Sequence, residues 1–285
     1  MNLRTLLILG RVSNLPTVWS NLLAGALFAD AGGNLPVVAA LLAGGSFIYI
    51  GGMYLNDYYD AEFDAKYCAN RPIPSGKIPR STVGGLALLW FFLGFACLAP
   101  LGWLVAVIAA ILVAAVALYD FRHKGIVWAP ALMGFCRFLL YVLAASVSPD
   151  RVTWTVVISD AAALGLYVAG ITYLARGESR PGKPARWALL LLAAPVILPI
   201  FVGLPKDLVL PWLAAATVPV AWTMWLLLPL WRKRNFPIGR LVSGLLAGIV
   251  LVDFLAVTPL LGWQAGWFLI LFLLALLLQR FVPAT

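Results

Sequence analysis

Ten apolar stretches, each about as long as a helix that crosses a lipid bilayer, occupy most of the 285-residue chain. They lie at 13–31, 36–55, 82–99, 101–119, 127–148, 153–174, 186–204, 208–230, 239–260 and 264–280. A bilayer core about 30 Å thick needs about 20 residues of helix, and a helix satisfies its own backbone hydrogen bonds in lipid. The pattern therefore predicts an all-α polytopic membrane bundle. Two pairs of stretches lie almost end to end, so nine spans fit as well as ten.

The composition excludes several other classes of protein. Only 11% of the residues are charged and 63% are hydrophobic, whereas soluble domains carry about 25% charged residues. Such a chain cannot cover a water-facing surface with polar groups, which excludes a soluble globule and a disordered chain. No soluble domain, long linker or low-complexity tract is evident, so we expect one membrane domain over residues 1–285. A lone histidine, His123, and three scattered cysteines argue against zinc and Ser-His-Asp chemistry.

The net charge of +9 follows from where the cations lie. With the N-terminus inside, 17 of the 20 Lys and Arg residues fall on the inner side; Arg151 and Lys206 fall outside and Arg137 within a span. This is the positive-inside bias of membrane proteins, and it does not indicate a nucleic-acid partner. The two sizeable inner loops, 56–81 and 175–185, share the cytoplasmic side. We expect an integral membrane protein, with a bacterial inner membrane favoured.

The first inner loop carries the strongest chemical signal. Asn56, Asp60 and Asp64 are spaced i, i+4 and i+8, which places them on one face of a helix. Oxygen-bearing side chains suit Mg²⁺, which proteins commonly hold with one or two carboxylates and the phosphates of a substrate. The alternative is a solvated acidic helix end. It fits poorly, because these acids lie on the side where the chain otherwise places cations.

A basic segment rich in turn-forming residues follows at 70–80. Its prolines and Gly76 prevent a long helix, and Arg71, Lys77 and Arg80 could approach the same anion. Arginine forms forked contacts with phosphate. Carboxylates for a metal beside guanidinium groups for phosphate oxygens predict a diphosphate ligand. A positive-inside loop that binds nothing remains the alternative.

These two segments together resemble a known family. The pattern Asn-Asp-x-x-Asp-x-x-x-Asp at 56–64, followed by Arg-Pro-Ile-Pro-Ser-Gly at 71–76, is similar to the first signature of the UbiA superfamily of intramembrane prenyltransferases. Asn56, Asp60 and Asp64 match its NxxxDxxxD positions, and Arg71 matches its arginine. The stretches 11–17 and Tyr119-Asp120 with Lys124 also look like the family. The resemblance covers about residues 8–190, and the remainder only as hydrophobic helices.

The resemblance implies a helical bundle around a central cavity that opens sideways to lipid. It also implies Mg²⁺ as the cofactor, a prenyl diphosphate as the donor and a lipophilic, often aromatic, acceptor. Ionisation of the diphosphate would be followed by alkylation of the acceptor, while the apolar interior binds the prenyl tail and excludes water.

The second inner loop departs from the family's pattern of two aspartates followed by a glycine and a basic residue. Glu178 falls at the second acid and Lys183 at the basic position, but Leu174 stands where the first acid belongs. One ligand fewer should weaken a second Mg²⁺ position, although Arg176 and Arg180 could partly substitute by neutralising the diphosphate directly. The stretch from Tyr173 to Glu178 is similar to that of the EboC-like branch of the family.

The roles implied by the resemblance fall into two groups. The metal and catalytic set comprises Asn56, Asp60, Asp64 and Glu178. The diphosphate-binding set comprises Arg71, Lys124, Arg180 and Lys183. These groups would stabilise the charge that develops on the leaving diphosphate.

Two rival hypotheses remain open. Arg137, Asp160 and Asp253 lie inside predicted spans, where charges are costly; they would serve acceptor binding or proton removal, or form a structural Arg–Asp pair. A transporter or lipid-binding protein would depend on these three residues, although no inverted repeat is evident. A degenerate UbiA relative would bind the diphosphate without turnover, and Leu174→Asp would then restore activity. Prenyl length and acceptor identity do not follow from the sequence.

Overall fold

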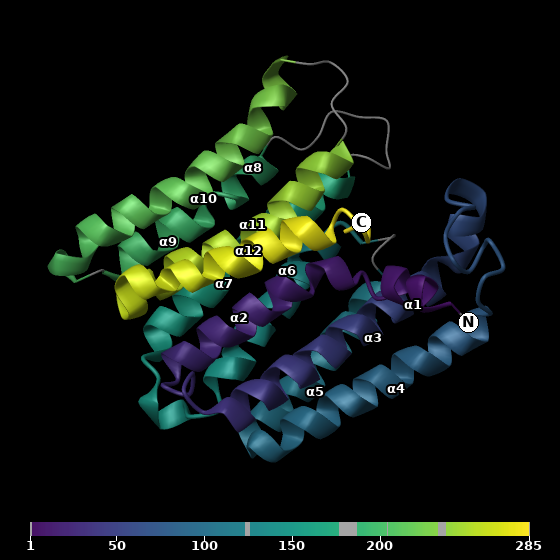
Figure 1. The fold of residues 1–285 in the computed structure, drawn as a ribbon, viewed down its shortest axis with the longest axis horizontal. Coiled ribbons are helices and arrows are strands. Elements are labelled where there is room, and N and C mark those ends of the chain that lie inside the picture. Colours follow the sequence, from purple (N-terminus) through teal and green to yellow (C-terminus); the bar gives the residue numbers. More distant parts are fainter. Residues whose placement is uncertain (1, 123–125, 177–186, 204, 233–237, 285) are drawn as a thin grey trace.

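The computed structural model describes residues 2–122, 126–176, 187–203, 205–232 and 238–284, the side chains of 230–232 excepted. Within these residues every regular element is a helix and no strand occurs, as Figure 1 illustrates. The prediction of an all-α bundle is therefore confirmed. Apolar helices dominate because a chain without polar surface can satisfy its backbone only internally.

The helices coincide with the predicted apolar stretches. Short elements open the chain: α1 (Leu3–Leu9), η1 (Val12–Asn14) and α2 (Leu15–Phe28). The central elements are α3 (Leu35–Tyr67), α4 (Arg80–Leu98), η2 (Ala99–Leu101), α5 (Trp103–Arg122), α6 (Ala129–Ala145), η3 (Pro149–Arg151) and α7 (Trp154–Arg176). The last are α8 (Ala188–Leu191), α9 (Ala194–Val202), α10 (Lys206–Arg232), α11 (Ile238–Leu261), η4 (Gly262–Gly266) and α12 (Trp267–Leu278).

Several of these helices are long and apolar enough to cross a membrane. In the described part of the chain six segments qualify: Leu35–Tyr67, Arg80–Leu101, Trp103–Arg122, Trp154–Arg176, Lys206–Pro229 and Ile238–Leu278. The last of them contains α11 and α12, and the shorter apolar helix Ala129–Ala145 stands apart from the six. The protein is therefore an integral membrane protein, while the number of nine or ten spans stays a prediction.

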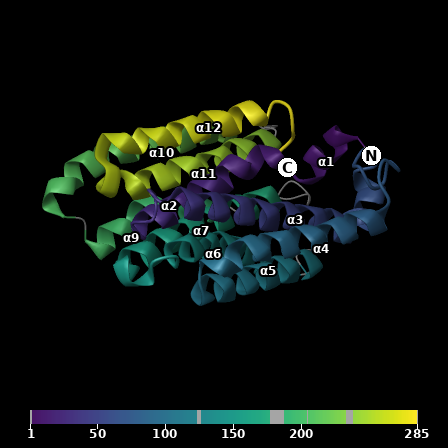
Figure 2. The same cartoon turned by 60° about the horizontal axis from the view of Figure 1, so that its bottom comes forward.

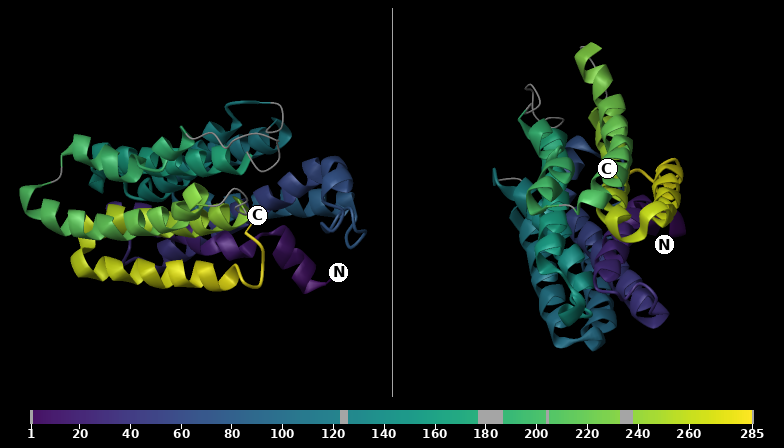
Figure 3. Two further views of the ribbon diagram at one scale, coloured as in Figure 1. Left: turned by 90° about the horizontal axis from the view of Figure 1, so that it is seen from above. Right: turned by 90° about the vertical axis from the view of Figure 1, so that its left-hand side faces the viewer.

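The long helices run roughly along one direction in layers (Figures 1 and 2). Helices α3, α4 and α5 form one side of the bundle, α2, α6 and α7 its middle, and α10, α11 and α12 the other side. Buried hydrophobic side chains form two main clusters, and α2 and α6 contribute to both, so these helices join the two halves. The N-terminus and the connection after α3 lie toward the same end of the bundle (Figure 3).

Helix α3 is longer than a bilayer requires. Its 33 residues span about 50 Å at 1.5 Å per residue, against a hydrocarbon core of about 30 Å. About 20 residues from Leu35 reach Leu55, so the segment from Asn56 to Tyr67 extends beyond the apolar part. This excess length carries the acidic residues to one end of the bundle.

Glycine allows a close contact between α6 and α7. A Cβ atom on Gly134 of α6 would overlap the backbone carbonyl of Gly165 on α7. Helices that pack in a membrane commonly use small residues where their backbones touch, because lipid offers no hydrophobic driving force between them. Gly134 and Gly165 therefore set the separation between α6 and α7.

We expect Gly134→Ala to lower the free energy of unfolding by about 1–3 kcal/mol, because the added methyl group forces α6 and α7 apart. Gly85→Ala on α4 is the matched control: a Cβ there meets nothing within 4 Å. That control should be neutral or stabilising by up to about 1 kcal/mol, since alanine favours a helix over glycine. Thermal unfolding in detergent measures both variants, and equal midpoints for the two would contradict the assignment.

Candidate active site

The acidic end of α3 presents one buried face. Asn56, Asp57, Asp60 and Asp64 are 8%, 6%, 8% and 3% exposed. The side chain of Glu62 is instead 84% exposed and lies on another face. Four polar side chains at the end of a long apolar helix are therefore turned toward the protein rather than toward water.

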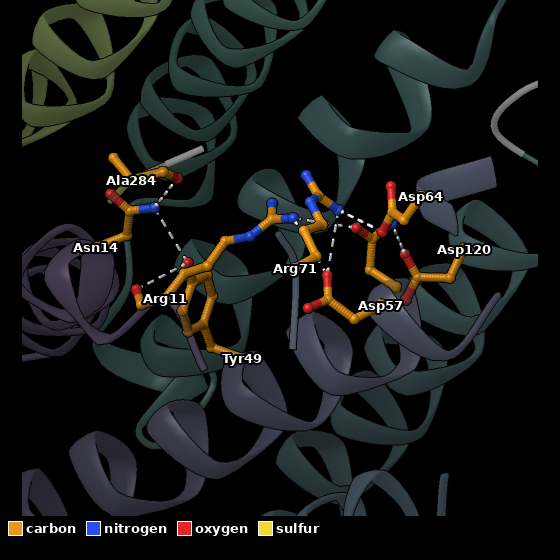
Figure 4. Close-up of polar contacts among 9 residues, drawn as sticks. Arg11, Asn14, Tyr49, Asp57, Asp64, Arg71, Asp120 and Ala284 are labelled. Carbon is orange, nitrogen blue, oxygen red and sulfur yellow. Dashed lines mark hydrogen bonds and ion pairs between the residues drawn. The ribbon is translucent and has the colours of Figure 1, made fainter. Parts of the chain in front are cut away.

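Arg71 lies against this face (Figure 4). Its Nη1 atom is 3.0 Å from Asp64 Oδ2 and 3.5 Å from Asp57 Oδ1. The chain folds back to bring it there after α3 ends at Tyr67. Burial on its own lowers the pKa of Arg71, but the carboxylates of Asp57 and Asp64 outweigh it and raise the pKa above the usual arginine value. Arg71 therefore stays charged at this site.

A second guanidinium comes from Arg11, at the junction of α1 and η1. Its Nη2 atom is 3.3 Å from Asn56 Oδ1 and 3.5 Å from Asp57 Oδ1. The backbone of Arg11 has φ 40° and ψ 48°, the left-handed conformation that is uncommon for residues other than glycine. Strained backbone of this kind clusters at functional sites. Asp57 thus lies between two cations from distant parts of the chain.

Asn56 links α3 to the end of α5. Its Nδ2 atom donates to Asp120 Oδ1 at 3.1 Å, while its Oδ1 atom accepts from Arg11. Asp120 is 3% exposed, so it adds a further buried carboxylate to the site. Arg11, Asp57 and Asp120 had no predicted role in the site. The likeness of the stretches 11–17 and Tyr119-Asp120 to the family was the feature of the sequence that could have indicated Arg11 and Asp120.

The carboxylates of this site suit an Mg²⁺ ion that is also held by the phosphates of a substrate. In the part of the chain that the structure describes, no group of three or more His, Cys, Asp or Glu side chains is arranged to hold a metal ion. Mg²⁺ commonly uses one or two carboxylates together with waters and substrate phosphates. The buried carboxylates of Asp60 and Asp64, one helical turn apart, match that requirement for an ion that binds with a diphosphate.

The other predicted cations of this segment lie elsewhere. Arg80 donates to Tyr58 O at 2.9 Å and to Glu62 Oε1 at 3.1 Å, on the face of α3 that carries Glu62. Lys77 lines a separate cleft with residues of α1. The expectation that Arg71, Lys77 and Arg80 approach one anion is therefore wrong for Arg80, because it lies on the face of α3 that carries Glu62, whereas Arg71 lies on the buried face with Asp57 and Asp64.

Four predicted site residues lie outside the described residues: Lys124, Glu178, Arg180 and Lys183. The helix that precedes three of them is described. Arg176, the last residue of α7, donates to Ile126 O at 2.9 Å and Val127 O at 3.2 Å. The end of α7 is thus joined to the connection that follows α5, the helix that carries Asp120.

Leu174 is a core residue. It is 2% exposed and belongs to a buried cluster with Ala188, Leu192 and Leu241. The hypothesis that Leu174→Asp restores activity assumed that this side chain faces the site. Its burial among aliphatic side chains changes the expected outcome of that substitution.

We expect Leu174→Asp to lower the free energy of unfolding by about 3–5 kcal/mol, the usual effect of an uncompensated buried charge, and to restore no activity. Leu174→Met conserves volume and should change the free energy by less than about 1.5 kcal/mol. Thermal unfolding and the yield of monodisperse protein in detergent compare the two. A stable Leu174→Asp variant with raised activity would contradict the core assignment.

A narrow cavity of about 70 Å³ lies among α3, α5 and α6. Tyr119 and Asp120 line it from α5, and Arg137 from α6, while most of its wall is apolar. Asp120 lines this cavity and also accepts the hydrogen bond from Asn56, so the cavity adjoins the polar site. Tyr119 contributes an aromatic side chain to the same lining.

The charges inside the bundle form a bridged network. Arg137 donates to Thr17 O at 3.2 Å, Thr17 Oγ1 at 3.1 Å and Asn21 Oδ1 at 2.8 Å. Asp253 Oδ2 accepts from Ser20 Oγ at 2.5 Å and Asn21 Nδ2 at 2.6 Å. Asn21 therefore bridges Arg137 and Asp253. A direct Arg–Asp pair was one of the alternatives predicted from the sequence. The network ties α2 to α6 and α11.

These features define an integral membrane protein with a polar, charged site at one end of an apolar helical bundle. The model of the UbiA prenyltransferase family matches residues 15–235, and the chain belongs to this family. The resemblance read from the two motif segments is thereby confirmed.

Curated relatives carry two kinds of name. Digeranylgeranylglyceryl phosphate synthase of Methanopyrus kandleri is 34% identical over 146 residues, covering 49% of this chain and 51% of that protein. 4-Hydroxybenzoate octaprenyltransferase of Photobacterium profundum is 31% identical over 111 residues, covering 38% and 37%. The alignments span about half or less of these relatives, so they do not establish a shared substrate.

Solved structures agree on the fold. A UbiA homolog from Aeropyrum pernix K1, in its apo form, has a TM-score of 0.65 at 18% identity, covering 86% of this chain and 96% of that one. A structure of digeranylgeranylglyceryl phosphate synthase has a TM-score of 0.55 at 19% identity, covering 98% and 95%. At such identities the likeness concerns the fold alone.

Proposed function

We propose that this protein transfers a prenyl group from a prenyl diphosphate to a lipophilic acceptor within the membrane, with Mg²⁺ as cofactor. One observation carries the proposal. Arg11 and Arg71 both contact the buried carboxylate face at the C-terminal end of α3, beyond its apolar part. Cations and carboxylates in contact form a site that accepts a metal and a phosphate together. Membership in a prenyltransferase family supports the same reaction.

The chain's own residues bind the donor in this proposal. The guanidinium groups of Arg11 and Arg71 turn from the carboxylates to diphosphate oxygens, and Asp60 and Asp64 hold the metal. Mg²⁺, when bound, neutralises negative charge on the diphosphate. These groups act where charge develops as the C–O bond breaks, so they stabilise the transition state more than the bound substrate.

The remaining steps take place on the apolar side of the site. Breaking of the C–O bond leaves its electron pair on the diphosphate and an allylic cation on the prenyl chain. The face of Tyr119 can stabilise that cation, and the apolar walls keep water from it. A nucleophilic atom of the acceptor then bonds to the prenyl carbon, and the acceptor releases a proton.

The second inner loop completes the proposal. Glu178 would hold a second Mg²⁺, and Lys124, Arg180 and Lys183 would bind diphosphate oxygens. Both motif loops would lie on the cytoplasmic side of a bacterial inner membrane, as the positive-inside bias favours. The whole chain, residues 1–285, would act as one membrane domain.

A second candidate function is binding of the diphosphate without turnover. The incomplete second motif favours it, because Glu178 is the only one of its two expected acids that is present, and Leu174 lies in the core and supplies no ligand. Release of diphosphate separates transfer of the prenyl group from binding without turnover.

The test incubates the purified protein with prenyl diphosphates of several lengths, in Mg²⁺ or EDTA, with 4-hydroxybenzoate or a prenylated glyceryl phosphate as acceptor. The two acceptors follow the names of the relatives. We expect Mg²⁺-dependent release of diphosphate and a prenylated product with one of them. Tight donor binding without release would favour the second candidate, and absence of donor binding would overturn both.

A further inference from the structure

A second site lies on the far side of the bundle from α3, α4 and α5. A cleft of about 650 Å³ opens between α10, α11 and the end of α12. Sites for small molecules commonly measure about 300–1,000 Å³, so the cleft is large enough for the head and upper chains of a lipid. None of the residues to which the proposed reaction assigns a role lines it.

Two arginines from different helices line this cleft. Arg240 lies in the first turn of α11, and Arg280 follows the end of α12; both are exposed. The described residues that line the cleft include no Asp or Glu. A cation in the first turn of a helix is disfavoured by the helix dipole, so Arg240 gains more from a bound anion than an arginine at a helix C-terminus would.

The walls of the cleft are mostly apolar, and ring contacts and hydrogen bonds fix the positions of their side chains. Trp222 lies 5.2 Å from Trp225 and 4.9 Å from Phe272, centroid to centroid, and its Nε1 donates to Gly244 O at 2.9 Å. Gln279 Nε2 donates to Ser243 O at 3.0 Å, which fastens the end of α12 to α11. A charged mouth above an apolar, tryptophan-lined wall suits an amphiphile rather than a soluble anion.

Hydrogen bonds place the cleft at the same end of the bundle as the candidate active site. Pro283 and Ala284 line the cleft, and Ala284 O accepts from Asn14 Nδ2 at 3.0 Å. Asn14 also donates to Tyr49 Oη, which donates to Arg11 O at 3.5 Å (Figure 4). The cleft thus lies at the end of the bundle that the positive-inside bias predicts for the cytoplasmic leaflet, where basic pockets between helices bind anionic lipid head groups.

We propose that this cleft binds one anionic phospholipid of the surrounding bilayer. The phosphate lies between Arg240 and Arg280, and the acyl chains lie against Trp222, Leu226 and Leu276. Guanidinium forks suit phosphate oxygens, and a bilayer lipid supplies both the anion and the apolar chains. The site is independent of the proposed prenyl transfer, since none of these residues contacts the acidic face of α3.

The test uses the full chain in nanodiscs of phosphatidylcholine with added phosphatidylglycerol, and no prenyl substrate. Native mass spectrometry after release from the nanodiscs counts the lipids that stay bound. We expect wild-type protein to retain one phosphatidylglycerol in preference to phosphatidylcholine. The double variant Arg240→Gln/Arg280→Gln should bind it about 10- to 30-fold more weakly. Both side chains are exposed, so an unchanged unfolding midpoint in pure phosphatidylcholine is expected for this variant.

The matched control is Arg4→Gln/Arg122→Gln, which removes the same charge from two other exposed arginines on the predicted inner side. It should retain the lipid as the wild type does. Equal loss in both double variants would mean only diffuse attraction to the membrane and would overturn the proposal. Equal retention of phosphatidylcholine, or displacement by millimolar inorganic phosphate, would overturn it as well, because the site would then lack selectivity for an anionic lipid.

Discussion

Asp60→Asn is expected to lower Mg²⁺-dependent release of diphosphate by about 100-fold or more. The substitution keeps the size of the side chain but removes a hard anionic oxygen from the buried face of α3. Partners that merely orient a metal ligand are worth about 10- to 100-fold, so a residue that itself holds the ion should be worth at least as much. Release of labelled diphosphate from purified protein at saturating donor measures the effect.

The matched control is Asp150→Asn. Asp150 is an exposed acid in η3, between α6 and α7, and the substitution makes the same change of charge and shape. It should leave the rate unchanged. Adding excess Mg²⁺ should recover part of the activity of Asp60→Asn if metal affinity is what was lost. Full product formation by Asp60→Asn at ordinary Mg²⁺ would remove Asp60 from the metal site.

Arg71→Gln is expected to weaken binding of the prenyl diphosphate by about 10- to 100-fold, because a charged hydrogen bond to an anion is worth about 1.5–3 kcal/mol. The same variant should bind Mg²⁺ more tightly in the absence of donor. Arg71 lies 3.0 Å from Asp64 and 3.5 Å from Asp57, so its removal releases two carboxylates from a competing cation. Calorimetry measures both ligands on the same protein.

Arg80→Gln serves as the control for Arg71→Gln. Arg80, the first residue of α4, has the same charge but pairs with Glu62 on another face of α3. Its loss should change neither affinity and should lower the free energy of unfolding by about 1–2 kcal/mol, because it removes the hydrogen bond to Tyr58 O as well as the surface ion pair. Opposite shifts of the two affinities in Arg71→Gln are the signature of its dual contact. Parallel loss of both would indicate a damaged fold instead.

Helical periodicity explains why the acidic face could be predicted from the sequence. Asn56, Asp60 and Asp64 share a face for the local reason that a helix repeats every 3.6 residues. The same local rule placed the apolar helices, because each must satisfy its own backbone in lipid. The likeness of the 56–76 segment to the UbiA family was equally local, and the family model matches residues 15–235.

Arg11 and Asp120 could not be assigned in this way. Asn56 contacts them across 45 and 64 residues of sequence. The packing of the helices decides whether a cation of an inner loop reaches the carboxylates. Arg71 and Arg80 are an example. They lie nine residues apart in one segment, yet Arg71 contacts Asp64 and Arg80 contacts Glu62.

Leu174 shows the limit of aligning positions without a fold. Its place in the second motif suggested a missing ligand, whereas its surroundings make it part of the core. Likewise, one basic and two acidic residues within predicted spans suggested an Arg–Asp pair, whereas the side chain of Asn21 lies between Arg137 and Asp253. Neither environment follows from spacing along the chain.

The sequence by itself determined the all-α class with its apolar helices, the face of α3 that carries the carboxylates and the family. The tertiary structure decided which guanidinium groups meet those carboxylates, which helix supplies Asp120, and which positions are buried. The physical reason is the range of the forces involved. Backbone hydrogen bonding in lipid and helical periodicity act within a few residues, whereas a buried charge needs partners that only packed helices can bring together.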